Sequence, residues 1–168
     1  GCDLAQRLEV DPPLTLREAI HFVRQAAEGL DYAHRQGVVH RDIKPSNLLI
    51  SAATGTIKVS DFGASFQEQL AQDTTQLTGI GSPAYMSPEQ IRLEDITHHT
   101  DIYSLGVVMY KLLTGRLPFS ASDQLSLTYE ILNVTPPPPS QLRPELPALL
   151  DEICLKAMEK SAANRYQS

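Results

Sequence analysis

The stretch at residues 101–113 constrains the fold most strongly, because its apolar side chains lie on nearly every side of the helix that it predicts. A surface helix has a polar face, and this stretch has almost none. Gly115 and Pro118 follow it as helix-ending residues. Its apolar residues are Ile102, Leu105, Val107, Val108, Met109, Leu112 and Leu113. We therefore expect a helix in the middle of a core, with other elements packed around it.

Further helices are predicted on either side of this central one. Thr15 and Glu18 have the spacing of a capping box, apolar residues recur at helical spacing after them, and Gly37 ends the helix. The apolar face expected there consists of Ile20, Val23, Ala27 and Leu30. Two shorter helices are expected at residues 122–133 and 146–158. A polyproline connector at residues 136–139 is expected between them. The chain is therefore predicted to be mainly α-helical.

One small β-hairpin interrupts the helices. Residues 48–50 and 56–59 are β-formers, and the turn-forming residues 51–55 lie between them. From residue 61 to residue 89 there is little periodicity, and Gly79, Gly81, Pro83 and Pro88 break any regular element. A loop of this length inside a compact domain is either functional or disordered.

Composition excludes several classes of protein. A chain of 168 residues, 42% hydrophobic and 20% charged, is typical of one compact globular domain. The net charge of −6 without a basic run argues against a nucleic-acid partner. No stretch approaches the roughly 20 apolar residues of a membrane-spanning helix, so we expect no membrane segment within this chain. Cys2 and Cys154 are expected to be free thiols, which favours a cytoplasmic location and is compatible with a membrane anchor elsewhere in a longer parent chain.

Three motifs occur in a fixed order along the chain. The first is HRDIKPSN at residues 40–47, the second is DFG at residues 61–63, and the third is SPE at residues 87–89. In this order the sequence resembles the protein kinase superfamily, whose pattern is H-R-D-L-x-x-x-N, then D-F-G, then A-P-E. The phrases YMSPEQ at residues 85–90 and DIYSLG at residues 101–106 are most similar to bacterial, eukaryotic-like Ser/Thr kinases. The resemblance covers essentially the whole chain.

The resemblance implies a role for each polar residue of the first two motifs. Asp42 would accept the proton of the substrate hydroxyl and orient its oxygen for attack, and Lys44 would neutralise the transferred phosphoryl group of ATP. Asn47 and Asp61 flank the predicted hairpin and would bind Mg²⁺ through their oxygens. Each of these residues taken alone is compatible with an ordinary turn or cap. Their joint occurrence in order favours the kinase interpretation.

The nucleotide would also contact residues outside the motifs. By family position, Leu49 would form the floor under the adenine, a role that overlaps with plain core packing. Asp3 matches the acidic residue that meets the ribose, and a solvated surface aspartate is the alternative. Asp101 would anchor the backbone of the 40–47 loop, or would simply be an acid favoured by the helix dipole.

The remaining expectations concern the long loop. Glu89 and Arg165 would form a buried ion pair, although Ala162 stands near the place where the family usually has proline. Ser82 would bond the catalytic Asp and Lys, or would be a turn serine. Arg41 would grip a phosphate on the loop. The candidate phosphorylation sites are Thr74, Thr75 and Thr78, and the alternative is that they are polar residues of a mobile loop.

The resemblance also implies what the sequence lacks. No glycine-rich phosphate loop of the kinase type and no V-A-I-K lysine is present, and in the family both belong to the N-terminal lobe. Residues 1–168 are therefore expected to be the C-terminal lobe of a kinase domain, with the N-terminal lobe absent. A lobe without its cover is expected to bind Mg-ATP weakly and to transfer phosphate poorly or not at all.

Two other functions remain open. Small-molecule phosphotransferases of the aminoglycoside-kinase kind share the fold but carry H-G-D; Arg41, Lys44 and the SPE motif argue against them. The second alternative is a non-catalytic pseudokinase or scaffold module. All four polar residues of the motifs are present, so only the absent lobe favours that alternative. A Ser/Thr protein kinase with a protein substrate is the preferred interpretation.

Overall fold

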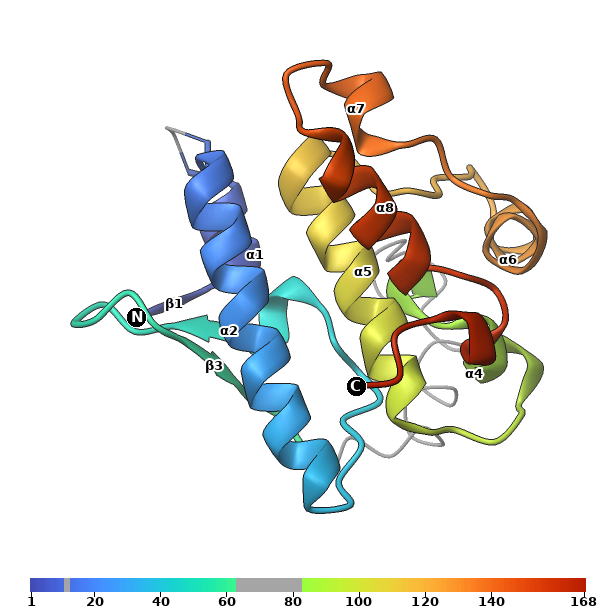
Figure 1. Cartoon of the computed structure of the whole chain (residues 1–168), viewed down its shortest axis with the longest axis horizontal. Coiled ribbons are helices and arrows are strands. Elements are labelled where there is room, and N and C mark those ends of the chain that lie inside the picture. Colours follow the sequence, from blue (N-terminus) through green and yellow to red (C-terminus); the bar gives the residue numbers. More distant parts are fainter. Residues whose placement is uncertain (11–12, 63–82) are drawn as a thin grey trace.

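The computed structural model describes residues 1–10, 13–62 and 83–168. Within these ranges the chain is mostly helical, with one three-stranded antiparallel sheet (Figure 1). The strands are β1 Cys2–Asp3, β2 Leu48–Ile50 and β3 Ile57–Val59. The helices are α1 Leu4–Leu8, α2 Leu16–Arg35, α4 Pro88–Arg92, α5 His98–Thr114, α6 Gln124–Asn133, α7 Pro139–Leu142 and α8 Ala148–Ala157. Short 3₁₀ turns lie at Pro45–Asn47, Pro83–Tyr85 and Ala162–Asn164.

Helix α5 is the centre of the helical body, as predicted. It packs against both α2 and α8, which flank it in Figure 1. Tyr103, Val107 and Val108 are completely buried. A Cβ at Gly106 would lie 2.9 Å from the Cβ of Ala157 in α8, so a glycine allows these two helices to approach closely. The helix begins three residues before the predicted start, at His98.

Helix α2 has the predicted boundaries and a different buried face. The capping box of Thr15 and Glu18 is confirmed, and Gly37 follows the helix with a φ of +76°. The buried side chains are Ala19, Phe22, Ala26, Leu30 and Ala33. Of the residues expected on the apolar face, Leu30 is buried and Val23 packs partly buried against the core, whereas Ile20 is 42% exposed. The reason is that small residues such as Ala19 and Ala26 fill the close contacts, and an apolarity pattern underrates them.

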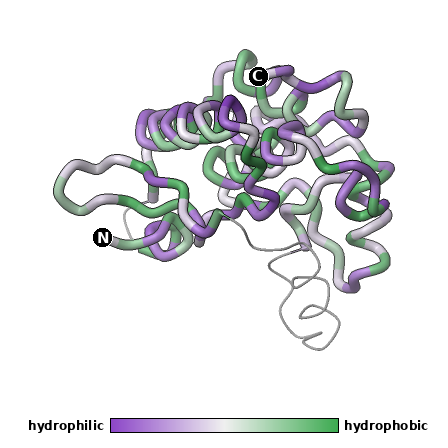
Figure 2. Tube along the Cα trace, turned by 90° about the horizontal axis from the view of Figure 1, so that it is seen from below, coloured by the Kyte–Doolittle hydropathy of each residue, from purple (hydrophilic) through white to green (hydrophobic). Residues whose placement is uncertain are grey.

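The predicted hairpin is confirmed, and a third strand joins it. Strand β1 pairs antiparallel with β2, and β2 with β3. The hairpin projects beyond the helices on the side of the N-terminus (Figures 1 and 2). A two-residue strand has no periodicity, so the sequence could not predict β1. Its effect is to bring the first residues of the chain beside β2.

Several short elements were also not predicted. Helices α1, α4 and α7 span five residues or fewer. Pro139, expected to end the polyproline connector, is instead the first residue of α7, a position where a proline is tolerated because its missing N–H would be unpaired. The ends of α6 and α8 agree with the prediction to within two residues. Among the described residues, no helix combines the length and apolarity needed to span a membrane.

Candidate active site

One carboxylate anchors the 40–47 loop to the start of α5. Asp101 is fully buried, and its two oxygens accept hydrogen bonds from the backbone N–H groups of His40 and Arg41, both at 2.8 Å. His34 Nε2, in the last turn of α2, lies 2.7 Å from the same carboxylate. A buried carboxylate needs such partners to offset its lost hydration. The anchoring bonds predicted for Asp101 are confirmed, and its place in the first turn of α5 also suits the helix dipole.

Two residues of the motifs have a left-handed backbone. The φ angle is +73° at Arg41 and +61° at Asp61, and each costs a non-glycine residue about 1–2 kcal/mol. Leu93, which ends α4, is the third such residue within the described ranges. Strained conformations persist only where their surroundings hold them, and they cluster at functional sites. The strain at Arg41 and Asp61 therefore marks this region as a candidate site.

His40 connects the 40–47 loop to the end of β3, a role that sequence reasoning missed. The backbone N–H of Asp42 donates to His40 Nδ1 at 3.2 Å, and His40 Nε2 lies 2.7 Å from the carbonyl oxygen of Ser60. Because one ring nitrogen must accept and the other must donate, the imidazole is the neutral Nε2–H tautomer. The ring is completely buried, and the ring of Phe62 packs against it edge-on, with 4.8 Å between the two ring centroids. His40 thus sets the relative position of Asp42 and Asp61.

The side chains of the loop converge on one carboxylate. Lys44 Nζ lies 2.8 Å from Asp42 Oδ2. Asn47 Nδ2 donates to the same oxygen at 2.9 Å and to the carbonyl oxygen of Asp42 at 2.8 Å. Asp42 and Lys44 are partly exposed, with 14% and 25% of their side chains accessible. Asp42, Lys44 and Asn47, all predicted from the motif, therefore form one cluster.

The proposed metal ligands are linked through Ser60. The N–H of Ser60 donates to the carbonyl oxygen of Asn47 at 2.9 Å, and Ser60 Oγ lies 3.2 Å from both that oxygen and Asp61 Oδ2. Since the amide nitrogen of Asn47 faces Asp42, its amide oxygen lies on the other side of the group. An amide oxygen and a carboxylate fit Mg²⁺, which takes one or two protein ligands together with phosphate oxygens and water. No cluster of three or more histidine, cysteine or acidic residues that could hold a metal occurs among the described residues.

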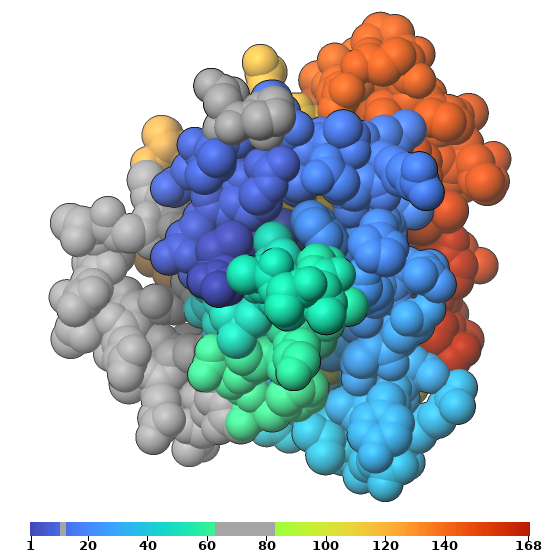
Figure 3. Space-filling view, turned by 90° about the vertical axis from the view of Figure 1, so that its left-hand side faces the viewer, coloured from blue at the N-terminus to red at the C-terminus, as the bar shows by residue number. Residues whose placement is uncertain are grey.

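A second surface lies on the sheet. Asp3, Leu49 and Lys58 are register partners across the three strands, so their side chains share one face. They line a shallow hollow of about 440 Å³. Figure 3 shows the N-terminal residues, the hairpin and α2 side by side on one face of the molecule. Leu49 is 43% exposed, whereas its neighbour Leu48 is buried. Asp3 also caps α1, because its carboxylate accepts the N–H of Gln6 at 2.8 Å.

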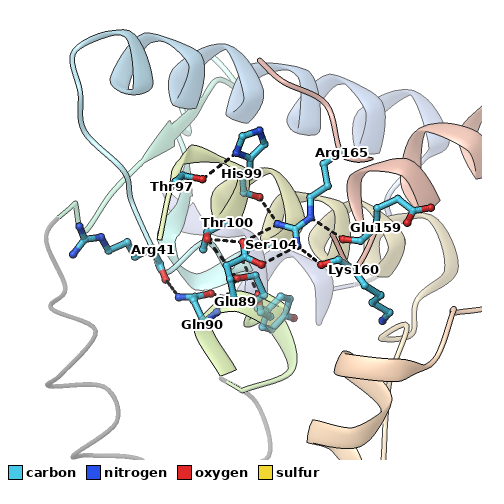
Figure 4. Close-up of polar contacts among 12 residues, drawn as sticks. Arg41, Glu89, Gln90, Thr97, His99, Thr100, Ser104, Glu159, Lys160 and Arg165 are labelled. Carbon is cyan, nitrogen blue, oxygen red and sulfur yellow. Dashed lines mark hydrogen bonds and ion pairs between the residues drawn. The ribbon is translucent and has the colours of Figure 1, made fainter. Parts of the chain in front are cut away.

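The predicted ion pair between Glu89 and Arg165 is present. Two guanidinium nitrogens donate to the two carboxylate oxygens at 2.7 and 2.8 Å, and both side chains are buried (Figure 4). Thr100 donates to the same carboxylate at 2.7 Å. Burial alone would raise the pKa of Glu89, but Arg165 and Thr100 outweigh it and lower the pKa to about 2. Ala162, in the place of the family's proline, does not prevent the pair.

Some predicted residues lie outside the described ranges, and one buried residue was missed. Gly63, Ser82 and the candidate phosphorylation sites Thr74, Thr75 and Thr78 fall within residues 63–82, which the structure does not describe. Gln90, only 2% exposed, bonds the backbone of the 40–47 loop. The Ser-x-x-Gln spacing of a capping box, with Ser87 as the cap, was the signal that could have placed it in a helix.

Comparison with known proteins shows the family of the chain. The family model described as the protein kinase domain matches residues 1–165. The chain belongs to the protein kinase family. The serine/threonine-protein kinase PknB of Mycobacterium leprae is 38% identical over 169 residues, and that of Mycobacterium tuberculosis strain H37Rv is 39% identical over 170. The probable serine/threonine-protein kinase PknB of Bifidobacterium longum is 40% identical over 168 residues.

The extent of these matches is uneven. The alignments cover 100% of this chain for the two mycobacterial kinases and 99% for the Bifidobacterium kinase. They cover 27%, 27% and 24% of the relatives, respectively. The chain therefore spans about a quarter of the length of these curated relatives.

Proposed function

We propose that residues 1–168 form the C-terminal lobe of a Ser/Thr protein kinase, which transfers the γ-phosphate of ATP to a hydroxyl group of a protein substrate. The observation that carries this proposal is the cluster of Asp42, Lys44 and Asn47 on a backbone anchored by buried Asp101. Membership of the protein kinase family and similarity to PknB kinases over the whole chain support it. A protein kinase of this type contributes to signalling through protein phosphorylation.

In this proposal Asp42 is the acceptor for the proton of the attacking hydroxyl. Its Oδ2 is held between Lys44 and Asn47, at 2.8 and 2.9 Å, so it is oriented before the substrate arrives. Positioning of this kind lowers the barrier because phosphoryl transfer needs alignment more than covalent help. Lys44 is a partly exposed point charge, suited to stabilise negative charge on the transferred group.

The nucleotide and its metal would bind on either side of this cluster. Asn47 and Asp61 would hold Mg²⁺, which supplies charge neutralisation for the phosphates. Leu49 would lie under the adenine and Asp3 near the ribose, on the shared sheet face. The partly exposed apolar surface of Leu49 suits an aromatic ring. Because Asp3 caps α1 with its carboxylate, its contact to a ribose would have to use the remaining acceptor capacity.

A labelled-ATP assay tests the proposal. Full-length protein containing this chain is incubated with Mg-ATP and a Ser/Thr protein substrate, beside an Asp42→Asn variant. We expect phosphate on Ser or Thr from the parent and a loss of at least about 100-fold in the variant. The chain alone is expected to be weak or inactive, because a kinase site needs preorganised groups on both sides of the nucleotide. The two free thiols are compatible with the cytoplasmic location proposed for this activity.

The same assay separates the alternatives. A folded full-length protein that transfers no phosphate to any hydroxyl would favour the pseudokinase or scaffold. Transfer to aminoglycoside sugars and not to peptides would favour the small-molecule phosphotransferase. The Lys44–Asp42 contact argues against the first alternative, because a scaffold has no need of a partly exposed, oriented acid–base pair.

A further inference from the structure

Gln90 is a buried residue of α4 that faces the 40–47 loop, and both the oxygen and the nitrogen of its side-chain amide form hydrogen bonds. It is 2% exposed, and its Nε2 donates to the carbonyl oxygen of Arg41 at 2.7 Å. Its Oε1 accepts the backbone N–H of Ser87 at 3.0 Å. Arg41 lies 49 residues before Gln90 in the sequence, and Ser87 lies three residues before it. Gln90 thus joins a helix at the end of the long loop to the residue before Asp42.

The chemistry of the two partners determines the orientation of the amide. A backbone N–H can only donate and a carbonyl oxygen can only accept, so the Gln90 oxygen must face Ser87 and the nitrogen must face Arg41. A carboxylate in this place could still accept from Ser87, since glutamate is the usual residue of a capping box. It could not donate to Arg41. The two bonds can therefore be separated by one substitution.

The peptide groups around Arg41 are held from two helices. Its N–H donates to Asp101 in α5, and its carbonyl oxygen accepts from Gln90 in α4. Between these two bonds the Arg41 backbone has its left-handed φ of +73°. A non-glycine residue stays in this region only when its surroundings over-determine it. Because Arg41 directly precedes Asp42, release of either bond lets the backbone relax and moves the Asp42 carboxylate.

Helix α4 and the 3₁₀ turn before it are held by several hydrogen bonds of their own. Figure 4 shows Gln90 reaching toward Arg41 from the same helix that carries Glu89. Arg165 and Thr100 hold the Glu89 carboxylate at 2.7–2.8 Å, and Ser104 in α5 donates to the carbonyl oxygen of Tyr85 at 2.8 Å. A hydrogen-bond donor on such a base constrains its acceptor strongly. The position of α4 is therefore transmitted to the 40–47 loop through one amide.

We propose that Gln90 is a positioning residue for phosphoryl transfer: its amide N–H holds the strained Arg41 peptide and thereby keeps Asp42 in its productive orientation. The inference rests on the proposed kinase function. It goes beyond that function by assigning a role to a residue that touches neither substrate nor nucleotide. Its consequence is that any displacement of α4 would disturb the acid–base group directly.

The test replaces Gln90 by glutamate in the full-length protein. Gln90→Glu keeps the capping bond and removes the donor, so kcat at pH 8 is expected to fall about 10- to 100-fold, as for a displacement of about 1 Å, with an unchanged KM for ATP. A carboxyl group buried there has a raised pKa, and its protonated form donates to Arg41 again. The ratio of variant to parent kcat is therefore expected to rise at least about threefold between pH 8 and pH 6.

Two further variants, compared with the parent and with Asp42→Asn, make the outcome decisive. Gln141→Glu, an exposed change of the same kind in α7, is expected to match the parent. Gln90→Met has similar length and no donor at any pH, so it is expected to lose kcat without recovery at pH 6. It also serves if Gln90→Glu fails to fold. An inactive parent, indistinguishable from Asp42→Asn, would count against the kinase function itself rather than against this inference.

Unfolding by urea is measured on each variant as a structural control. Full activity of Gln90→Glu or Gln90→Met would overturn the inference. The inference would also be overturned if Gln90→Glu lost the same fraction of kcat at every pH and lost stability in parallel. Recovery at low pH in Gln90→Glu alone, with stability close to that of the parent, would establish the role of the donor.

Discussion

Two carboxylate–cation pairs of nearly equal length lie in very different surroundings. In the 40–47 loop, Lys44 lies 2.8 Å from Asp42, and 25% and 14% of these side chains are exposed. At α4, Arg165 lies 2.7 Å from Glu89, and 0% and 9% of these side chains, respectively, are exposed. The first pair uses one nitrogen, and the second is bidentate. Distance alone would not distinguish them.

The two pairs differ in burial and in geometry, and this difference suits them to different roles. A lysine ammonium is a mobile point charge that can follow a substrate, whereas a guanidinium forms a planar, fixed fork. Arg165 also donates to the carbonyl oxygens of Glu159, Lys160 and His99. A pair with every donor in use has no capacity for a ligand. The buried pair therefore ties α4 to the C-terminal segment of the chain, whereas the partly exposed pair has the accessibility that the proposed catalytic role requires.

The largest expected effect on stability is at the buried pair. Arg165→Met leaves the Glu89 carboxylate buried without its cation, so the free energy of unfolding should fall by about 3–5 kcal/mol. Guanidinium unfolding followed by circular dichroism measures it. Arg24→Met is the matched control, because Arg24 and Glu28 form an exposed pair at 3.1 Å and should contribute less than about 0.5 kcal/mol. Equal effects of the two substitutions would refute the distinction.

The partly exposed Lys44–Asp42 pair should show the opposite pattern, with a large effect on kcat and a small effect on stability. Lys44→Met should reduce kcat of the full-length protein by about 100- to 1000-fold, because a charge aimed at the transferred group is lost. The free energy of unfolding should change by less than about 1 kcal/mol, since the pair is partly solvated. Steady-state kinetics and denaturant unfolding on the same preparation measure both. A stability loss as large as that of Arg165→Met would show that this pair is structural as well.

The stability of the chain should depend on pH through Glu89. Its pKa in the folded chain is about 2, below the ordinary value of 4.5, so the charged form is favoured by folding. This contribution, about 3 kcal/mol, is fully present above pH 4.5 and is lost as the pH falls toward 2. Unfolding at pH 6, 4 and 3 should show the loss. In Glu89→Gln the same interval should show a smaller slope; an unchanged slope would assign the loss to other groups.

The smallest effect concerns the ring beneath Arg165. Tyr103 is completely buried, its ring centroid lies 4.9 Å from Arg165 Cζ, and its hydroxyl has no hydrogen-bond partner among the described residues. Burial accordingly raises the pKa of this hydroxyl. Tyr103→Phe keeps the ring and removes an unsatisfied group, so stability should stay the same or rise by up to about 1 kcal/mol. A loss of more than about 2 kcal/mol would reveal a hidden partner.

Sequence patterns predicted the elements that local physics determines. The capping box at Thr15, the hairpin around residues 51–55 and the apolar helix at residues 101–113 each depend on neighbours in the chain, and all were confirmed. The residues of the loop cluster, Asp42 and Lys44 among them, were predicted from a motif. Their mutual contact could not be derived from spacing, because it depends on how the loop turns.

Apart from the short elements, the missed features depend on distant contacts. The sequence analysis assigned no role to His40, the first residue of the HRD motif, although its ring connects Asp42 to Ser60. The sequence analysis also assigned no role to Gln90, whose partner Arg41 lies 49 residues away in the sequence. The buried face of α2 was misjudged because small alanines pack where another helix approaches. Side chains that bridge two segments have no periodicity to reveal them.

The sequence by itself determined the longer helices and the hairpin, the family, and the chemical groups available to the site. These follow from local preferences and from residue types at fixed spacings. Only the tertiary structure decided that Asp42 stays partly accessible beside Lys44 and Asn47, and which backbone groups His40 and Gln90 hold. The physical reason is that burial and hydrogen bonding across 49 to 76 residues arise when the helices pack, and no local pattern encodes that packing.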